Sequence, residues 1–389
     1  MTNVAAGIMP GRLEAIHYES GELVQVELSG GKIERMTRLD EERDNQPWIA
    51  PGLLDLQING YQGMDFNTLP IASGMPQQFT RALWAEGVTS YLPTVITNSS
   101  EAIAEAVVAI AAACAADAYT DYAVAGIHLE GPFISPEDGP RGAHGKAFVR
   151  PPDWELFQRW QEAAQGKIKI ITLSPEWPGS AKFIEKVTAS GVIVSIGHTS
   201  ATAEQIREAA SAGASMSTHL GNGAHLMLPR HPNYIWEQLA QDQLWACMIA
   251  DGFHLPESVL KVIMKVKGER AMLVSDAVQL AGMPPGEYAP HIGGKVVLTP
   301  EGRLHLADQL NLLAGSAQML LRGVEQMTRL KLCTFAEAWN MASIRPRAFL
   351  NGNGKELAFG AGTAADFVLL DRDGDSLRIR ETYVQGVRV

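Results

Sequence analysis

Residues 192–219 read VIVSIGHTSATAEQIREAASAGASMSTH and contain the repeating unit of the fold. The β-branched run Val192–Ile196 predicts a buried strand, and the alanine-rich segment Ala203–Ala212 predicts a helix that follows a capping-box pattern. A further short run, Ser215–Thr218, predicts the next strand. Strands that alternate with helices in this way are typical of parallel sheets, and a histidine closely follows each of these two strands.

The same alternation extends over most of the chain. Eight short apolar runs predict strands at Leu53–Ile58, Thr89–Ile96, Val124–Leu129, Ile168–Leu173, Val192–Ile196, Ser215–Thr218, Trp245–Ile249 and Ala271–Val274. Helical patterns lie at Pro76–Ala85, Glu101–Ala116, Trp154–Ala164, Ala181–Ala189, Ala203–Ala212, Ser258–Val266 and Ala317–Thr328. This alternation predicts a (β/α)8 TIM barrel over residues 51–349. A doubly wound sheet is the alternative, but residues 56–63 (LQINGYQG) lack the GxGxxG that would follow its first strand.

Strand patterns also occupy both ends of the chain. Those near the start are Arg12–Tyr18, Leu23–Leu28 and Lys32–Met36, and those near the end are Asp366–Leu370, Ser376–Ile379 and Glu381–Val389. Both ends are rich in strands while the middle alternates strand and helix. We therefore expect a small β-sandwich domain, built from residues 1–50 and 350–389, beside the barrel.

The composition excludes several classes of protein. The 389 residues are 46% hydrophobic and 19% charged, which is ordinary for a soluble globular protein. A net charge of -11 argues against a nucleic-acid partner. The most apolar helical segment, Glu101–Ala116, is too short to span a membrane. Three isolated cysteines and an N-terminus without a secretion-signal pattern predict a cytoplasmic protein.

Chemically reactive residues lie at or just after the ends of five predicted strands. Glu130, His198 and His219 are three of them, and the corresponding ends of barrel strands meet on one face. Any one of these histidines alone could be an ordinary buried residue. Together with the carboxylate, they suit one divalent ion such as Zn²⁺, with Fe²⁺ or another divalent ion as alternatives, and leave a position for water.

Two further residues of this kind predict acid–base chemistry. Asp276 follows the eighth strand, where a carboxylate can take a proton from water and deliver it to a leaving amine. His254 follows the seventh strand and can polarise a carbonyl or hold the substrate. Asp251, close to it in sequence, is expected to be structural.

Two absences indicate one metal ion rather than two. The first strand ends with Gln57 and Asn59, where a two-metal barrel hydrolase usually has His-x-His, and amides are poor metal ligands. The fourth strand ends Leu173-Ser174-Pro175, without a lysine that could become a bridging carbamate. The sequence therefore predicts a single divalent ion per subunit.

A set of motifs carries a resemblance to a known family. In order over residues 51–316 they are PGLLDLQINGYQGMDF, HLEGPFIS, GHTSA, THLGNGA, IADGFH, LVSDA and LAGS. With the tail GAGTAADFVLL, the whole chain resembles the N-acetylglucosamine-6-phosphate deacetylases of the amidohydrolase superfamily. The resemblance implies metal-dependent hydrolysis of the acetamido group of an N-acetyl-hexosamine 6-phosphate, in the first place N-acetylglucosamine 6-phosphate to glucosamine 6-phosphate and acetate.

The resemblance also implies roles for individual residues. The metal ligands would be Glu130, His198 and His219, with Asp276 as the general acid–base. The substrate contacts would be Gln57, Asn59, His144, Asn222, Gly223, Arg230 and His254, of which His254 lies near the acetamido group. Members of the family are typically homodimers, so a homodimer is implied here.

One loop departs from the family pattern. Residues 221–224 are GNGA where the family usually has FNAM, and residues 230–233 are RHPN where it has REPG. Arg230 keeps the position expected to hold the phosphate, and arginine suits that contact. The flanking changes leave the preference for a 6-phosphate open. Two other functions remain: an amidohydrolase for another N-acyl or a cyclic amide, which would not need Arg230, and a non-catalytic sugar-binding protein.

Overall fold

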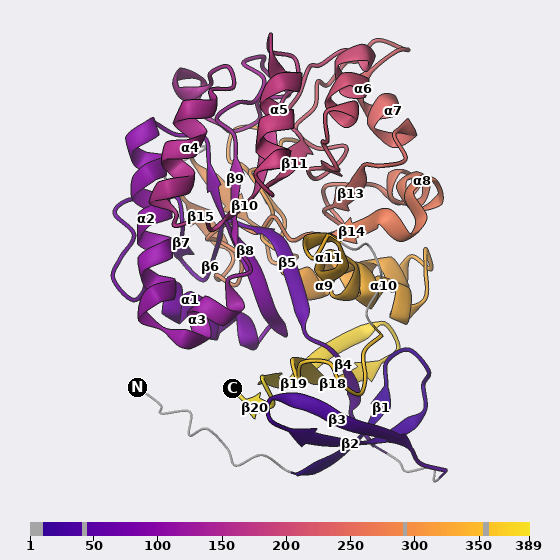
Figure 1. Cartoon of the computed structure of the whole chain (residues 1–389). Coiled ribbons are helices and arrows are strands. Elements are labelled where there is room, and N and C mark those ends of the chain that lie inside the picture. Colours follow the sequence, from indigo (N-terminus) through magenta and orange to yellow (C-terminus); the bar gives the residue numbers. More distant parts are fainter. Residues whose placement is uncertain (1–10, 41–44, 291–293, 353–357) are drawn as a thin grey trace.

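The structure is a computed structural model that describes residues 11–40, 45–290, 294–352 and 358–389 (Figure 1). The first ten residues, on which the prediction about a secretion signal depends, lie outside this part. Parts of the segments assigned to the small domain, residues 41–44 and 353–357, lie outside it as well.

Eight parallel strands form the central sheet, in the order β14-β13-β12-β11-β10-β9-β8-β5. They are β5 (Leu53–Ile58), β8 (Val88–Ile96), β9 (Ile127–Glu130), β10 (Ile168–Leu173), β11 (Ile193–Ile196), β12 (Met216–Ser217), β13 (Trp245–Met248) and β14 (Ala271–Leu273). All eight predicted strands are present, with small differences at their ends. The outer strands β5 and β14 meet at a seam, which is joined by a single parallel bridge between Ile58 and Ala277.

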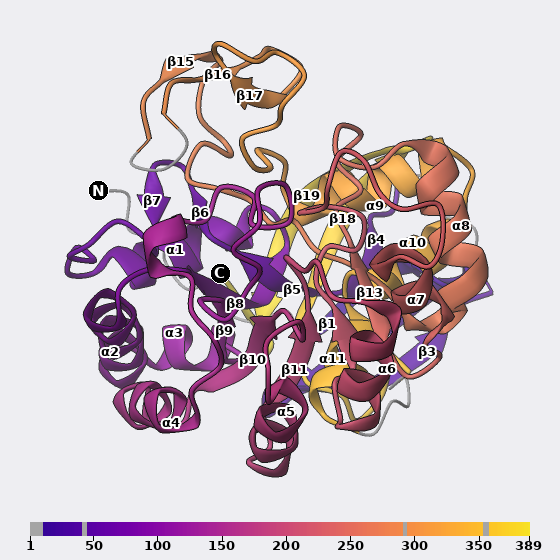
Figure 2. The ribbon, with the colours of Figure 1, turned by 90° about the horizontal axis from the view of Figure 1, so that it is seen from above.

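Helices surround these strands (Figure 2). The predicted ones are α1 (Met75–Trp84), α2 (Ser100–Ala116), α4 (Trp154–Ala163), α5 (Ser180–Ala189), α6 (Ala203–Ser211), α8 (Glu257–Lys267) and α9 (Leu320–Arg329). Short additional ones are α3 (Ala118–Ala123), α7 (Tyr234–Ala240), α10 (Phe335–Met341), α11 (Ile344–Leu350), and the 3₁₀ turns η1 (Lys146–Phe148) and η2 (Gly268–Arg270). Helix α6 begins with the expected capping box, in which Thr202 and Gln205 bond each other's backbone N–H. Within the described ranges, no helix combines the length and apolarity needed to cross a bilayer.

Strands from both termini form a second sheet, in the order β20-β19-β18-β4-β1-β2-β3, below the barrel in Figure 1. They are β1 (Arg12–His17), β2 (Leu23–Ser29), β3 (Lys32–Arg38), β4 (Trp48–Pro51), β18 (Phe367–Asp373), β19 (Ser376–Val384) and β20 (Val387–Arg388). Strand β4 joins the two ends, because it pairs with β1 on one side and with β18 on the other. The structure confirms that strands from both ends of the chain belong to one β-sheet.

One strand prediction in this sheet is wrong. The segments Ser376–Ile379 and Glu381–Val389 were expected to be separate strands, but β19 runs through Arg380 without ending. The pairing with β18 shifts register there, because Ile379 faces Leu370 while Glu381 faces Leu369. The break in the sequence pattern is therefore a β-bulge.

Two small sheets complete the architecture. Strands β6 (Gly60–Tyr61) and β7 (Met64–Asp65) form a hairpin directly after β5. Strands β15 (Gly286–Tyr288), β16 (Val296–Leu298) and β17 (Leu304–Leu306) form an antiparallel sheet between β14 and α9. In the view from above this sheet lies at the periphery of the molecule (Figure 2).

Candidate active site

The three predicted metal ligands lie together at the C-terminal end of the barrel. Glu130 is the last residue of β9, His198 comes two residues after β11, and His219 two residues after β12. All three side chains are buried. Their convergence follows from the parallel sheet, because neighbouring parallel strands end on the same side.

The distances between the ligand atoms suit a tetrahedral ion. Glu130 Oε1 lies 3.1 Å from His219 Nε2 and 3.3 Å from His198 Nε2, and the two Nε2 atoms lie 3.0 Å apart. Ligands about 2.0–2.1 Å from a tetrahedral Zn²⁺ are separated from one another by about 3.3 Å. The three atoms are therefore spaced like three corners of such a site.

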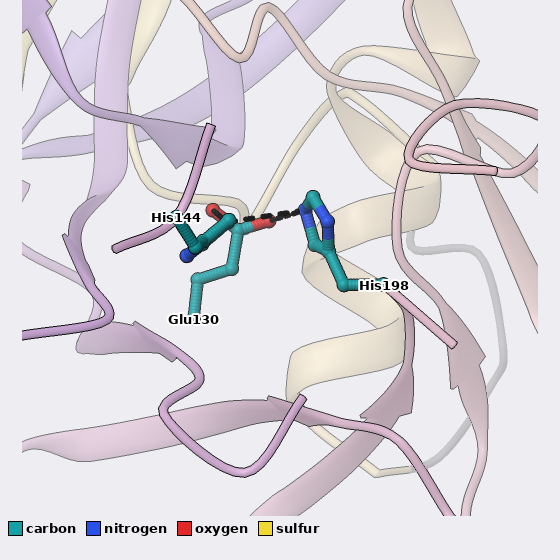
Figure 3. A group of neighbouring side chains, drawn as sticks. All are labelled: Glu130, His144 and His198. Atoms are coloured by element: carbon teal, nitrogen blue, oxygen red, sulfur yellow. Dashed lines mark hydrogen bonds and ion pairs between the residues drawn. The ribbon is translucent and has the colours of Figure 1, made fainter. Parts of the chain in front are cut away.

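A fourth possible ligand, His144, joins this group. Its Nε2 lies 3.3 Å from His198 Nε2 and 3.9 Å from Glu130 Oε2. Figure 3 shows the side chains of Glu130, His144 and His198 drawn together, and their ligand atoms all lie within 4.8 Å of one another. The resemblance assigns His144 to the sugar, and in the structure its ring lies beside the predicted ligands His198 and Glu130.

The hydrogen bonds of these histidines fix where their protons lie. His198 Nδ1 lies 2.8 Å from the carbonyl oxygen of Pro140, which can only accept, so Nδ1 is the protonated nitrogen. The hydroxyl of Thr97 donates to the carbonyl oxygen of Glu130 and so accepts from His144 Nδ1 at 2.8 Å. In the neutral rings both Nε2 atoms turn a lone pair toward the same point, which is the arrangement that a cation stabilises.

The charges of Glu130 and His144 fit the same interpretation. For His219, burial acts to lower the pKa, but the hydrogen bond and charge of Glu130 raise it. Burial alone would raise the pKa of Glu130, but hydrogen bonds with His198 and His219, and charge from His198 and His144, hold that pKa well below its usual range. Burial lowers the pKa of His144 to about 3, with the nearby His198 adding to the effect. An ionised carboxylate and a neutral imidazole are the protonation states that bind metals.

Two side-chain amides hold Asp276. Asn59 Nδ2 donates to Asp276 Oδ1 at 2.8 Å, and Gln57 Nε2 donates to the same oxygen at 3.2 Å. Gln57 Nε2 also donates to Glu130 Oε1 at 2.8 Å, so one amide group links the acid–base candidate to a ligand candidate. Because both amides use Oδ1, Oδ2 is the oxygen of Asp276 that is left to exchange a proton.

The protonation of Asp276 suits acid–base chemistry. Burial raises the pKa of this carboxyl to about 6, and the negative charge of Glu130 acts in the same direction, against the opposing effects of His219 and His254. A pKa near the working pH allows a group both to accept and to return a proton.

His254 has a carboxylate partner. Its Nδ1 lies 2.7 Å from Asp251 Oδ2, while Asp251 Oδ1 accepts the backbone N–H groups of Phe253 and His254. Burial would raise the pKa of Asp251, but these contacts with His254 lower it. Asp251 therefore orients the ring, a role that the sequence analysis missed although the three-residue spacing could have indicated it.

Three predicted site residues other than glycine have a left-handed backbone. The φ angles of His198, His219 and Asp276 are 48°, 26° and 47°. For residues other than glycine, such conformations cost about 1–3 kcal/mol each and persist only where the surrounding structure enforces them. Their coincidence at the ends of three strands supports a functional site.

The loop after His219 is only partly drawn into this group. Asn222 Nδ2 donates to the carbonyl oxygen of His219, and Gly223 lies so close to His198 that an added Cβ would be 2.7 Å from Nδ1. The structure leaves Arg230, the expected phosphate contact, exposed. It thus brings Asn222 and Gly223 to the predicted ligands His219 and His198 and leaves Arg230 at the surface.

Comparison with known proteins identifies the family of the chain. The Amidohydrolase family is matched over residues 48–389. The chain belongs to the amidohydrolase family. The N-acetylglucosamine-6-phosphate deacetylase of Bacillus subtilis (strain 168) is 33% identical over 368 residues, which are 90% of this chain and 89% of the relative. The Homo sapiens enzyme of the same name is 34% identical over 362 residues, which are 89% of this chain and 85% of the relative.

Solved structures show that the similarity to these deacetylases extends to the fold. The crystal structure of the N-acetylglucosamine-6-phosphate deacetylase from Pasteurella multocida has a TM-score of 0.83 at 25% identity, and covers 96% of this chain and 97% of that one. Within the amidohydrolase family, the chain thus groups with the N-acetylglucosamine-6-phosphate deacetylases, as its motifs predicted.

Proposed function

We propose that this amidohydrolase removes the acetyl group from an N-acetyl-hexosamine 6-phosphate, in the first place N-acetylglucosamine 6-phosphate, and releases glucosamine 6-phosphate and acetate. The observation that carries the proposal is Asp276, held through Oδ1 beside the buried group of Glu130, His198 and His219. The curated relatives bear the name of this reaction. The substrate class comes from them, and the chemistry comes from the side chains.

Glu130, His198 and His219 would hold one divalent ion, with His144 as a neighbour at the same point. We propose Zn²⁺, and Fe²⁺ or another divalent ion is the alternative. When bound, such an ion lowers the pKa of water, to about 7 in favourable zinc sites, and polarises a carbonyl. Gln57 and Asn59 donate N–H groups where two-metal relatives carry histidines, which supports a single ion.

The residues of the chain would act in sequence. Asp276 would take a proton on Oδ2 from the attacking water while Asn59 and Gln57 hold Oδ1. His254, held at Nδ1 by Asp251, would hold the acetyl oxygen through Nε2. Asp276 would then return its proton to the amine nitrogen as the bond to the acetyl carbon breaks, so that the sugar leaves as a neutral amine.

We also propose a homodimer. Leu226 and Met227 are 97% and 89% exposed on the loop that carries Arg230, and Trp236 is 57% exposed just after it. Adjacent exposed apolar side chains of this size are typical of an interaction surface. Light scattering of the wild-type protein should give twice the mass of one chain. The double variant Leu226→Asp, Met227→Asp should give the mass of a single chain. A wild-type monomer would contradict this.

The proposed location is the cytoplasm, with catalysis confined to a domain of residues 51–349 and a small domain formed by residues 1–50 and 350–389. Expression of residues 51–349 alone tests that division. Because Tyr18 OH donates to Asn340 Oδ1 and Tyr122 OH donates to Asp366 Oδ2 across this division, we expect the fragment to be less stable than the whole chain.

Acetate release tests the function directly. We would compare N-acetylglucosamine 6-phosphate, its C4 epimer and unphosphorylated N-acetylglucosamine with the metal-loaded protein. A preference for the phosphate is expected, and Arg230→Ala should reduce kcat/KM for that substrate about 10- to 100-fold, the effect of one charge-assisted hydrogen bond. The unphosphorylated sugar provides the control, since Arg230→Ala should not affect it. Equal turnover of both would indicate that the altered loop selects another N-acyl substrate.

A further inference from the structure

A chain of buried polar groups crosses the barrel beneath the ligands. His128 Nδ1 lies 3.0 Å from the carbonyl oxygen of Leu56, and His128 Nε2 lies 2.7 Å from Thr172 Oγ1. Thr172 Oγ1 lies 2.7 Å from Thr218 Oγ1, which lies 2.5 Å from Ser195 Oγ. These four side chains are at most 2% exposed, so they exchange hydrogen bonds with one another rather than with solvent.

The carbonyl group of Leu56 determines the direction of every link. A carbonyl oxygen only accepts, so His128 Nδ1 donates, and the neutral ring must accept at Nε2. Thr172 therefore gives its single proton to His128 and must accept from Thr218. Thr218 in turn must accept from Ser195. Every hydrogen bond in the row then has one donor and one acceptor. The donors and acceptors of these side chains therefore have a single consistent assignment.

Four of the five strands that contribute to these hydrogen bonds also carry a residue of the candidate site, in the strand or shortly after it. Leu56 directly precedes Gln57, His128 lies two residues before Glu130, Thr218 directly precedes His219, and Ser195 lies three residues before His198. Thr172, on β10, links the two halves of the chain, and its carbonyl oxygen also accepts the N–H of Gly131. The hydrogen bonds therefore connect the strands that supply the ligand group.

We propose that His128 and Thr172 are positioning residues for the metal site. They fix the relative heights of β5, β9, β11 and β12, and so keep Glu130, His198 and His219 at mutual distances of 3.0–3.3 Å. A small shift of one strand relative to its neighbours would change these distances. Metal–ligand distances in real sites stay within about 0.2 Å of their usual values. This inference rests on the proposed function, because it concerns the same divalent ion.

Thr172→Val tests the inference with a side chain of nearly the same shape. It removes the donor to His128 and the acceptor for Thr218, while the backbone ladder of β10 stays intact. Loss of a partner bonded directly to a ligand weakens metal affinity about 10- to 100-fold. Thr172 acts through the strands that carry the ligands, so we expect the lower end of that range, about 10-fold, for Zn²⁺ titrated into the apoprotein against a chromophoric chelator. Activity is not needed for this measurement.

Thr89→Val is the matched control. Thr89 is a fully buried threonine of β8 near the N-terminal end of the barrel, where its hydroxyl contacts Leu53 and Arg347 rather than the polar chain. The Thr89→Val variant should have a lower Tm than wild type, as Thr172→Val should. Its Zn²⁺ affinity should nevertheless stay within about twofold of wild type. A merely structural role for Thr172 would make the two variants behave alike.

Ser195→Ala keeps the test decisive if Thr172→Val does not fold. It removes only the first donor of the chain and should weaken Zn²⁺ binding about 2- to 10-fold, the effect of one neutral hydrogen bond. Wild-type affinity in Ser195→Ala or in folded Thr172→Val would overturn the positioning role. A wild-type protein that binds no divalent ion would instead overturn the proposed function, and the inference with it.

Discussion

Asn59 Nδ2 donates a 2.8 Å hydrogen bond to Asp276 Oδ1 across the seam where the first and last strands of the barrel meet. The backbone closes the same seam, since Asn59 N donates to the carbonyl oxygen of Ala277 and Asp276 N donates to that of Gln57. Both the main chain and the side chain of Asp276 are therefore held by the first strand. This explains how a residue with a left-handed backbone keeps one orientation.

Replacing Asp276 by Asn should remove proton transfer and little else. The amide has the same size, so the fold should persist, but it can neither take a proton from water nor return one to the amine. We expect kcat to fall by about 10²-fold or more, with unchanged metal content by elemental analysis. An undiminished kcat would exclude Asp276 from the mechanism.

Removing the metal should destabilise the folded chain. The Nε2 atoms of His144 and His198 lie 3.3 Å apart, and an ion bound between them would relieve the repulsion of their lone pairs. At an ion concentration of 100 times Kd, binding adds about 2.7 kcal/mol to the free energy of unfolding, which calorimetry detects as a higher Tm. Dialysis against a chelator should reverse this shift and abolish turnover.

His198→Asn is the control for metal removal. Asparagine tolerates the left-handed backbone at this position better than alanine, so the variant loses the ligand without added backbone strain. Its Tm should respond only weakly to the ion. A chelator that leaves both the Tm and the turnover of the wild type unchanged would contradict the metal site.

Asp55 should make stability depend on pH. This carboxyl is fully buried, and burial raises its pKa to about 7. The folded state therefore holds the proton more tightly than the unfolded state, whose pKa is about 3.9. The free energy of unfolding should then fall as the pH rises from about 4 through 7, by at most about 1.4 kcal/mol per pH unit from this group.

The variant Asp55→Asn isolates that effect. It keeps an oxygen that can accept from Ser275 N, as Asp55 Oδ1 does at 3.1 Å, but it does not titrate. Urea unfolding across the same pH window should show a shallower decrease than in wild type. Parallel curves for the two proteins would mean that Asp55 does not change its protonation there.

Asp251→Asn should impair catalysis through His254. The substitution weakens the 2.7 Å contact with Nδ1 and so frees the ring. We expect a loss of about 10- to 100-fold in kcat, the effect of one charge-assisted hydrogen bond. Asp153→Asn, which keeps a good N-cap on α4, should leave kcat unchanged. Equal activity of both variants would return Asp251 to a purely structural role.

The barrel and the strand ends that carry the candidate ligands were predictable because both depend on periodic patterns. The strands are buried on both faces and appear as short apolar runs, and the phase of each run places Glu130, His198 and His219 at the same end. The short helices α7, α10 and α11 escaped prediction, because seven residues are too few to establish a helical period.

The surroundings of the ligands were less predictable. His144 lies on a loop after β9, and no sequence period determines the path of a loop, so its approach to His198 came only from the structure. The same holds for Arg230, whose exposed position reflects the path of the loop before α7. Asp251 differs, since its spacing from His254 was visible and was interpreted too cautiously.

The sheet shared by the two termini has a consequence for the way the protein is made. During synthesis β4 leaves the ribosome long before β18, its antiparallel neighbour in the finished sheet. Until residues 367–373 arrive, β4 has an unpaired edge, which can pair with other chains. A chain that terminates before this point would keep that edge exposed, so premature release should yield aggregation-prone fragments rather than shortened enzymes.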